Sequence, residues 1–373
     1  MKRYLKEDAV PSLNLPVRSC DGPTTSESAA RRAERIQKRE QGIKQLPHAE
    51  DDEEQSVNIM DELHDVLKQD IGVQVSLTEM VSGRLNLFSL LDSDQKLCVM
   101  TGIPSFDILS SLEKLVQVEL PSVRDVERGI IVTMMRLKIG LTFTALGVLL
   151  GTDRSTCSRL FATVLPVLAC IMKDVLSWPT KDQVASNMPK CFHQFRKVRV
   201  VLDCTEVSVE RPNCLDCRIS SYSHYHGGES VKVMIGCSPA GTITFVSDAY
   251  GGKASDKKIF NDSDLLGKLE PYVDAVMVDK GFMIDDECLF NAIELVRPPF
   301  LKSNKQLSAA DAKLTKKIAC ARVHVERVIQ RVKQYSVLKN KLPWSMMPYV
   351  NHIFTVICGL TNLSPPILAD DKF

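Results

Sequence analysis

The chain has 373 residues, of which 44% are hydrophobic and 25% charged, proportions that are ordinary for a protein able to bury a core. Lys and Arg number 47 against 46 Asp and Glu, and the net charge of +1 excludes a histone-like, wholly basic protein. The first residues are charged and lack an apolar core, so we expect no secretory signal. The longest apolar run, at 160–172, is too short to cross a bilayer. Twelve irregularly spaced cysteines then indicate reduced thiols in an intracellular compartment.

Residues 1–72 form a charged arm that we expect to be largely disordered. Apolar residues are sparse there, and a basic run at 31–44 precedes an acidic block at 50–54, so the charges are segregated. The basic run fits a solvated helix; the alternative is a nuclear-import signal or a DNA-contacting arm.

Helical patterns follow the arm. Apolar residues at helical spacing predict a helical region over 73–122. Over 123–178 the sequence predicts a helix-turn-helix: a helix at 126–137, a short helix at 144–150 between Thr142 and Gly151, and a third helix from about 152 to 165. The third helix of such a motif enters the DNA major groove, and its polar residues here are Arg154, Ser155, Thr156 and Arg159. The same pattern also fits a three-helix bundle without a DNA role.

The periodicity changes after Pro189. Apolar, mostly β-branched runs predict strands at 198–202, 231–235, 242–246 and 275–278, and Gly241 provides a hairpin turn between the second and third. Helical patterns occupy 257–269, 285–293 and 308–338. This mixture predicts an α/β domain over 195–365.

Three carboxylates occupy positions where a sheet-based site can form. Asp203 and Asp279 each end an apolar strand, at the edge where such sites occur. Glu326 lies in the last long helix and shares one face with Arg322 and Lys333. Converging carboxylates repel each other unless cations lie between them. Their oxygen atoms are suitable ligands for Mg²⁺ or Mn²⁺. Two such ions held side by side can catalyse the cleavage of a phosphodiester bond. Taken alone, each acid is equally an ordinary strand-end or helix-surface residue.

The distribution of charge favours a site. Residues 297–341 contain twelve Lys and Arg but only two acids, Asp311 and Glu326, so this stretch carries +10 and the rest of the chain −9. A basic surface around a buried Glu326 would suit a polyanionic substrate.

A C-x-x-C pair gives a weaker indication of a metal. Cys214 and Cys217 have His224 and His226 nearby, which permits zinc, but a second C-x-x-C pair is missing.

Two further features lie in the middle of the α/β domain. The run Gly251-Gly252-Lys253 lacks the following Ser or Thr and the spaced first glycine of a phosphate-binding loop. Asp256, shortly after, either adds a fourth acid to the site or caps a helix.

Five segments carry a family resemblance when taken together: VLDCTE at 201–206, KVMIGCSP at 232–239, FVSDAYGGKASD at 245–256, VMVDKGF at 276–282 and IACARVHVERVI at 318–329. With the upstream helix-turn-helix segment and Trp178-Pro179, they resemble the DDE-superfamily endonucleases of PIF/Harbinger-type transposases. The resemblance covers roughly residues 87–363. It implies a ribonuclease-H-like α/β catalytic domain preceded by an all-α helix-turn-helix region. It also implies a metal-binding catalytic triad of Asp203, Asp279 and Glu326.

The last segment is also similar to the R-x3-E-x6-K pattern of related insertion-sequence transposases, at Arg322, Glu326 and Lys333, which implies DNA contacts for Arg322 and Lys333. Two positions depart from the patterns. Ala319 stands where a tyrosine often precedes the arginine, and Lys280 follows the second aspartate where arginine is more usual.

Residues 4–11 resemble the closing Ala-Val-Pro segment of THAP-type zinc modules, which some transposons fuse to this nuclease. A chance match in so short a segment explains it equally well. The first cysteine is Cys20, so the zinc-binding part of such a module was either lost or left out of the gene model.

We therefore expect a nuclear, Mg²⁺- or Mn²⁺-dependent DNA endonuclease or transposase that acts on double-stranded DNA and does not bind membranes. The resemblance also suggests a Myb-like accessory DNA-binding protein and a second copy of the chain as partners. One alternative is a domesticated DNA-binding or regulatory protein that keeps the fold without turnover. Another is an RNA-cleaving enzyme of the same fold.

Overall fold

The computed structural model describes residues 91–300 and 308–366, all of which belong to one compact unit, Thr78–Phe373. The predictions for the charged arm, for the THAP-like segment at 4–11 and for residues 73–90 lie outside the described residues.

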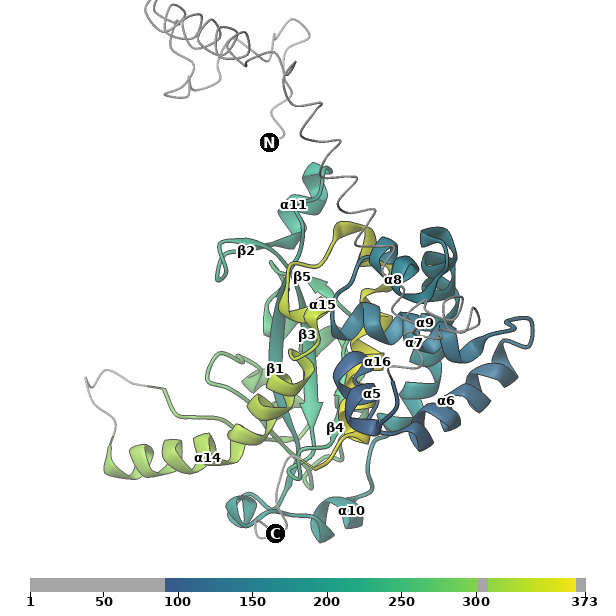
Figure 1. Cartoon of the computed structure of the whole chain (residues 1–373). Coiled ribbons are helices and arrows are strands. Elements are labelled where there is room, and N and C mark those ends of the chain that lie inside the picture. The colour runs from purple at the N-terminus through teal and green to yellow at the C-terminus, as the bar shows by residue number, and fades with distance from the viewer. Residues whose placement is uncertain (1–90, 301–307, 367–373) are drawn as a thin grey trace, which may run out of the picture. The chain divides into compact units, whose positions relative to one another are not determined.

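The N-terminal part of the described chain is helical, as predicted (Figure 1). Each of its first four helices begins at a Ser, Thr or Asp whose side chain accepts a backbone N–H of the first turn. Gly102 and Gly151, both left-handed, end the first and the fourth helix. The helices are α5 (Asp94–Thr101), α6 (Phe106–Glu119), α7 (Val126–Lys138), α8 (Phe143–Leu150) and α9 (Arg154–Val175).

Helix α9 is longer than predicted. It continues beyond 165 to Val175 with Pro166 inside it, because a buried apolar stripe continues through Leu168 and Met172. With these added residues α9 is both long enough and apolar enough to span a bilayer. The prediction that no apolar run of the chain reaches that length is therefore wrong. A core helix of a soluble protein meets the same criteria, and α9 packs along α7 and α16 (Val350–Leu363).

A mixed seven-stranded sheet follows, in the order β2-β3-β1-β6-β7, with β4 and β5 paired to β3. Strand β1 runs antiparallel to β3 and parallel to β6, which is parallel to β7. Together with the helical region before it, this sheet confirms the predicted ribonuclease-H-like α/β architecture. The strands are β1 (Val198–Ser208), β2 (Tyr222–Ser223), β3 (Gly228–Cys237), β4 (Ile243–Val246), β5 (Tyr250–Gly251), β6 (Ala275–Met277) and β7 (Glu294–Val296).

Several predicted bounds are wrong. Strand β1 continues to Ser208, so Asp203 lies inside this strand and not at its end. The helix predicted at 257–269 is the shorter α12 (Asp256–Asp262) followed by the 3-10 turn η2 (Leu266–Lys268). The helix predicted at 285–293 ends early as α13 (Asp285–Phe290), and a turn at 291–293, with Ala292 at a positive φ, leads into β7. The pattern at 308–338 divides into α14 (Ala309–Val332) and α15 (Ser336–Lys339). The remaining elements are α10 (Lys181–Ser186), η1 (Lys190–Phe192), α11 (Leu215–Ser221) and η3 (Trp344–Tyr349).

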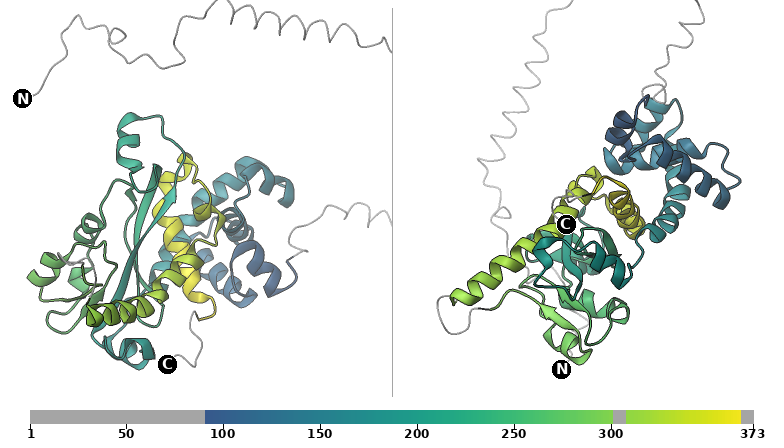
Figure 2. Two further views of the ribbon diagram at one scale, coloured as in Figure 1. Left: turned by 90° about the vertical axis from the view of Figure 1, so that its left-hand side faces the viewer. Right: turned by 90° about the horizontal axis from the view of Figure 1, so that it is seen from below.

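The two faces of the sheet are covered by different helices (Figure 2). Alternate residues along a strand point to opposite faces. Val201 and Ile235 therefore pack with α14, α16 and the N-terminal helices in one large core. Leu202 and Met234 pack with α12 and α13 in a second, smaller core. The large core is continuous from α5 to α16, so the helix-turn-helix region and the sheet share it.

Candidate active site

Two aspartates lie side by side in the sheet. In the parallel pair of β1 and β6, Val201 is opposite Met277, and Asp203 and Asp279 each follow two residues later. Two residues are one full repeat of the strand pleat, so both aspartates point to the face of Val201 and Met277, which α14 covers. The structure thus brings together the two aspartates that the sequence singled out.

Arg322 of α14 bridges these aspartates. Its Nη1 donates a 2.8 Å hydrogen bond to Oδ1 of Asp279, and its Nη2 lies 3.7 Å from Oδ2 of Asp203. The residue is only 8% exposed. The DNA contact predicted for Arg322 stays a prediction, whereas its partners in this structure are the two carboxylates.

The electrostatics of Asp203 reflect its neighbours. Burial raises the pKa of the Asp203 carboxyl to about 6, against the opposing effect of the Arg322 guanidinium. Asp279 and Glu326 add to the rise in pKa, and the hydrogen bond from the Cys204 N–H reduces it. Asp203 therefore lies within electrostatic reach of both other predicted carboxylates.

Glu326 and Asp203 line one open cavity of about 620 Å³, which also contains Lys333 and Lys339. Glu326 is exposed, so the expectation of a buried carboxylate is wrong. It lies beside the apolar stripe of α14, which Val325 and Ile329 continue into the core. Lys333 is half-buried, and burial lowers its pKa while Asp203 opposes that shift.

Asp203, Asp279 and Glu326 are the side chains that would hold a divalent metal. Within residues 91–300 and 308–366, no three His, Cys, Asp or Glu side chains lie close enough together to hold an ion as they stand. The guanidinium of Arg322 occupies the position between Asp203 and Asp279 where a cation would bind. The three carboxylates nevertheless suit a hard divalent cation, because such ions prefer oxygen ligands. Two of them, Asp203 and Asp279, already share the positive charge of Arg322. The zinc alternative gains no support, since both Cys214 and Cys217 are free thiols outside any such group.

A second charged cluster lies further along β1, and of its members the sequence singled out only Asp256. Lys232 places its Nζ 3.1 Å from Oε1 of Glu206 and 3.3 Å from Oδ1 of Asp256. Glu206 and Lys232 face each other across the antiparallel pair of β1 and β3, a register that the predicted strand at 198–202 was too short to indicate. Ser255 caps α12, so the cap predicted at Asp256 is wrong by one residue, and Asp256 binds Lys232 instead.

The turn of the helix-turn-helix depends on one glycine. The carbonyl of Gly147 accepts the Thr152 N–H at 2.9 Å, and a Cβ at Gly147 would lie 2.7 Å from the carbonyl oxygen of Thr152. Glycine therefore allows α8 and α9 to meet at this angle.

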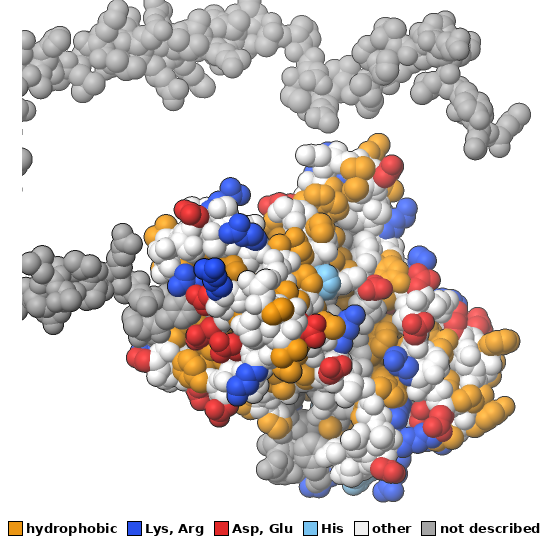
Figure 3. All heavy atoms as spheres, turned by 90° about the vertical axis from the view of Figure 1, so that its right-hand side faces the viewer, with side chains coloured by type: hydrophobic (Ala, Val, Ile, Leu, Met, Phe, Trp, Pro, Cys, Tyr) orange, Lys and Arg blue, Asp and Glu red, His pale blue; other side chains and the backbone are white. Residues whose placement is uncertain are grey.

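The predicted DNA-contacting residues occupy the first turns of α9. Arg154, Ser155 and Arg159 are exposed, Thr156 is half-buried, and Cys157 points into the core. Figure 3 views the molecule from the side of these helices and shows basic and acidic side chains interspersed, so no single sign of charge covers this face.

Two family models match the chain. Residues 202–362 match the DDE superfamily endonuclease, and residues 122–174 match the helix-turn-helix of DDE superfamily endonuclease. No curated protein and no solved structure shows a significant match. The first match contains Asp203, Asp279 and Glu326, and the second contains α7, α8 and nearly all of α9. The chain therefore carries the endonuclease domain of the DDE superfamily behind the helix-turn-helix domain of that superfamily, as a protein derived from a DDE transposase does.

Proposed function

We propose that the protein is a metal-dependent DNA endonuclease of the transposase type, which hydrolyses phosphodiester bonds with Asp203, Asp279 and Glu326. The observation that carries this proposal is the convergence of the two aspartates on α14. Asp203 lies in β1 and Asp279 lies two residues beyond the end of β6, each two residues after the pair Val201–Met277. Both contact Arg322, one helical turn before Glu326. The endonuclease family match spans all three residues.

In this proposal the three carboxylates hold Mg²⁺ or Mn²⁺. When bound, the metal supplies Lewis acidity for the attack of water on the phosphodiester and for the departure of the leaving oxygen. The chain's own contribution is positional. The Cys204 N–H fixes the carboxylate of Asp203 with a 2.9 Å hydrogen bond, and Lys333 and Lys339 supply positive charge to the cavity that would receive a phosphate. Arg322 has to withdraw from the aspartates for the metal to enter.

The helix-turn-helix supports double-stranded DNA as the substrate, since the predicted contact residues lie at the exposed start of α9. A nuclear location, a Myb-like accessory protein and a second copy of the chain belong to the same proposal, and the resemblance to PIF/Harbinger-type transposases supports them.

One observation favours a second candidate, a domesticated DNA-binding protein without turnover. The Arg322 guanidinium already compensates the charge of Asp203 and Asp279. A chain that no longer cleaves DNA could keep both acids in this way without any metal.

A nicking assay separates the two candidates. Supercoiled plasmid is incubated with the protein and Mg²⁺ or Mn²⁺, and the wild type is compared with Asp279→Asn and Glu326→Gln. We expect both variants to lower the nicking rate by at least about 100-fold, because each removes a charge from a metal ligand. DNA binding by Glu326→Gln should persist or tighten, since a negative charge leaves a basic surface.

The matched control is Glu119→Gln, which removes an exposed carboxylate at the end of α6. It should nick at the wild-type rate. A Glu326→Gln protein that cleaves as fast as the wild type would contradict the proposed triad. A wild type that binds DNA with metal present but never nicks it would favour the second candidate.

A further inference from the structure

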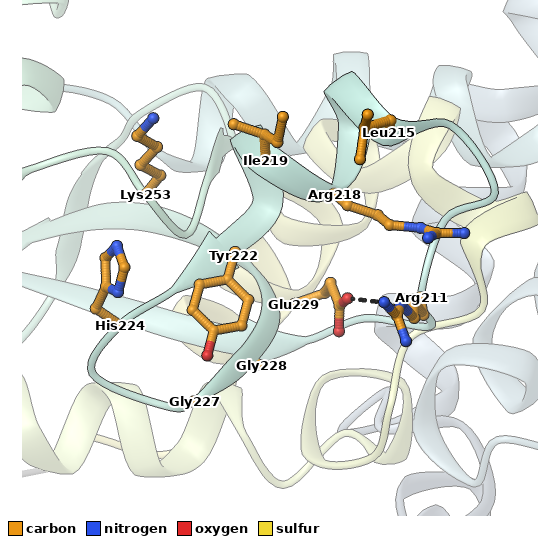
Figure 4. Close-up of a pocket in the computed structure, with 10 residues that line it drawn as sticks. All are labelled: Arg211, Leu215, Arg218, Ile219, Tyr222, His224, Gly227, Gly228, Glu229 and Lys253. Atoms are coloured by element: carbon orange, nitrogen blue, oxygen red, sulfur yellow. Dashed lines mark ion pairs between the residues drawn. The ribbon is translucent and has the colours of Figure 1, made fainter. Parts of the chain in front are cut away.

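A second cavity, of about 580 Å³, lies at the end of the sheet beyond Asp203 (Figure 4). It is formed where α11 and the loop before it meet the start of β3 and the turn after β5. The side chains that matter for its chemistry are Arg211, Leu215, Arg218, Ile219, Tyr222 and Lys253.

The polar side of this cavity is positively charged. Arg211, Arg218 and Lys253 line it together with one acid, Glu229, which already pairs with Arg211 at 3.4 Å. Arg218 has a structural role as well, because its Nε donates to the carbonyl of Pro212 at 2.6 Å. This bond fixes the loop that carries Arg211, so the wall is held in place.

The Gly251-Gly252-Lys253 run has a structural role here. A Cβ on Gly251 would overlap the carbonyl of Ser220, and one on Gly252 would overlap Oγ of Ser230. The two glycines therefore let the turn press against the end of α11, and this contact places the exposed Lys253 on the cavity wall.

The other side of the cavity is apolar and aromatic. Tyr222 is 40% exposed and meets His224 edge-on, with the ring centroids 5.3 Å apart. Leu215 and Ile219 project from α11 and are both more than half exposed. Figure 4 shows the Tyr222 ring between Lys253 and His224 on one side and Arg218 and Arg211 on the other. An exposed ring among cations is the arrangement that binds single-stranded nucleic acid, since bases stack on the ring and phosphates bind the cations.

The position relative to the triad can be estimated along β1. Asp203 is opposite Ile235, whereas the N–H of Val209 donates to Glu229 on the cavity wall. Six residues at about 3.3 Å each separate the two points by about 20 Å. That distance corresponds to about six nucleotide steps of roughly 3.4 Å.

We propose that this cavity binds an unpaired nucleotide of the DNA substrate, about six steps from the cleaved bond. Its base stacks on Tyr222, and its flanking phosphates contact Arg211 and Lys253. This inference rests on the proposed function, since it assigns a second DNA contact to the same nuclease. The excess of cations over acids on the wall is what favours DNA over a protein partner.

The test measures DNA binding in an Asp279→Asn background, which does not cut the probe. Fluorescence anisotropy compares a blunt duplex with the same duplex carrying a single-stranded 3′ tail. We expect the parent to bind the tailed probe more tightly. Tyr222→Ala should weaken binding of the tailed probe roughly tenfold and remove the preference, whereas Tyr222→Phe keeps both.

A charge variant tests the phosphate binding. Arg211→Ala with Lys253→Ala should weaken the tailed probe more than the blunt duplex. On the tailed probe it should also reduce the slope of log K against log[salt] by up to about 1.4, at roughly 0.7 for each single-strand phosphate that is no longer neutralised. This measurement tests whether the cavity binds DNA even if Tyr222→Ala does not fold.

Two controls match these changes. Tyr225→Ala removes a ring that is 90% exposed and does not line the cavity. Lys96→Ala with Lys114→Ala removes two charges and one ion pair, that of Lys96 with Asp92, on the N-terminal helices. Both controls should bind like the parent.

Each remaining outcome is decisive. If the parent binds DNA and the cavity variants behave like the controls, the cavity proposal is overturned while the proposed function stands. If the parent binds neither probe, both fall. If the cavity variants alter sedimentation without altering DNA binding, the cavity serves contact with a second copy and the proposal is wrong.

Discussion

Arg322 holds together two carboxylates that would otherwise repel each other. Asp203 is half-buried and has a raised pKa even with the guanidinium present. Asp203 therefore depends on a nearby cation, and in this structure the guanidinium of Arg322 is that cation.

Replacing Arg322 by methionine tests this dependence. Arg322→Met keeps most of the buried stem but removes the charge, and without metal it should lower the free energy of unfolding by on the order of 2 kcal/mol. Added Mg²⁺ should then raise the melting temperature more than in the wild type, because the ion no longer competes with the guanidinium.

Thermal melts with and without Mg²⁺ or a chelator check this expectation. Lys316→Met, an exposed position on the same helix, is the control and should respond to metal as the wild type does. Melts that stay unchanged by excess metal in all three proteins would count against a metal site at Asp203 and Asp279.

His324 provides a pH-dependent contribution on the buried side of α14. Its Nδ1 lies 2.7 Å from the carbonyl of Pro239, and burial lowers its pKa below the ordinary value of 6.5. A buried histidine with a lowered pKa stabilises the fold fully above about pH 6.5. That stabilisation is lost as the pH falls through the folded-state pKa.

The variant His324→Asn keeps a donor to Pro239 but does not titrate. We expect its free energy of unfolding, measured in urea between pH 7.5 and 5, to fall less steeply than that of the wild type. Equal slopes for the two proteins would show that another group controls the acid sensitivity.

Sequence could place Asp203 and Asp279 because each follows an apolar run of the same kind, and strand alternation then sends both to one face. It could not place the partner of Arg322. Spacing along α14 shows that Arg322 and Glu326 share a face, but the orientation of that face over the sheet depends on packing between distant segments. The same gap explains why Glu326 was expected to be buried.

Among the elements, the helix-turn-helix was the most predictable, because its signals are local. Thr142 and Gly151 fix the ends of α8 by capping, whatever the rest of the chain does. Strand β7 was missed because it has only three residues, too few for an alternating strand pattern to show in the sequence. The end of β1 was missed because Cys204 to Ser208 is too polar a stretch to be distinguished from a loop.

Arg154 and Arg159, at the start of α9, are exposed and are predicted DNA contacts. Arg154→Ala with Arg159→Ala should weaken binding to duplex DNA at least tenfold and leave the melting temperature within about 2 °C, since both side chains are exposed. Electrophoretic mobility shifts and a thermal melt check the two halves of this statement. A double variant that unfolds would show that these residues support the core.

At the scale of the whole molecule, the predicted helix-turn-helix region at 123–178 and the predicted nuclease domain at 195–365 share one hydrophobic core. Helix α9 lies along α16, and Gly359 permits the contact, because a Cβ there would lie 2.7 Å from Met172. We therefore expect the two parts to unfold together.

Gly359→Ala should lower the free energy of unfolding by about 1–3 kcal/mol through overpacking against Met172. The loss should appear as one shifted transition, with far-UV circular dichroism and the fluorescence of Trp178 and Trp344 following the same curve. Gly267→Ala is the control, since nothing lies within 4 Å of its Cβ position. Two separate transitions in the wild type would contradict a single cooperative core.

Helix α9 has 22 residues and is therefore about 33 Å long, close to one turn of B-DNA. Its first two turns carry the predicted base contacts, and its last turns are fixed in the core that supports the sheet. For the function proposed above, this helix would hold the DNA-contacting residues at a fixed distance from the catalytic domain. The offset between the sequence that is recognised and the bond that is cut would be a constant of the fold, counted in whole base pairs.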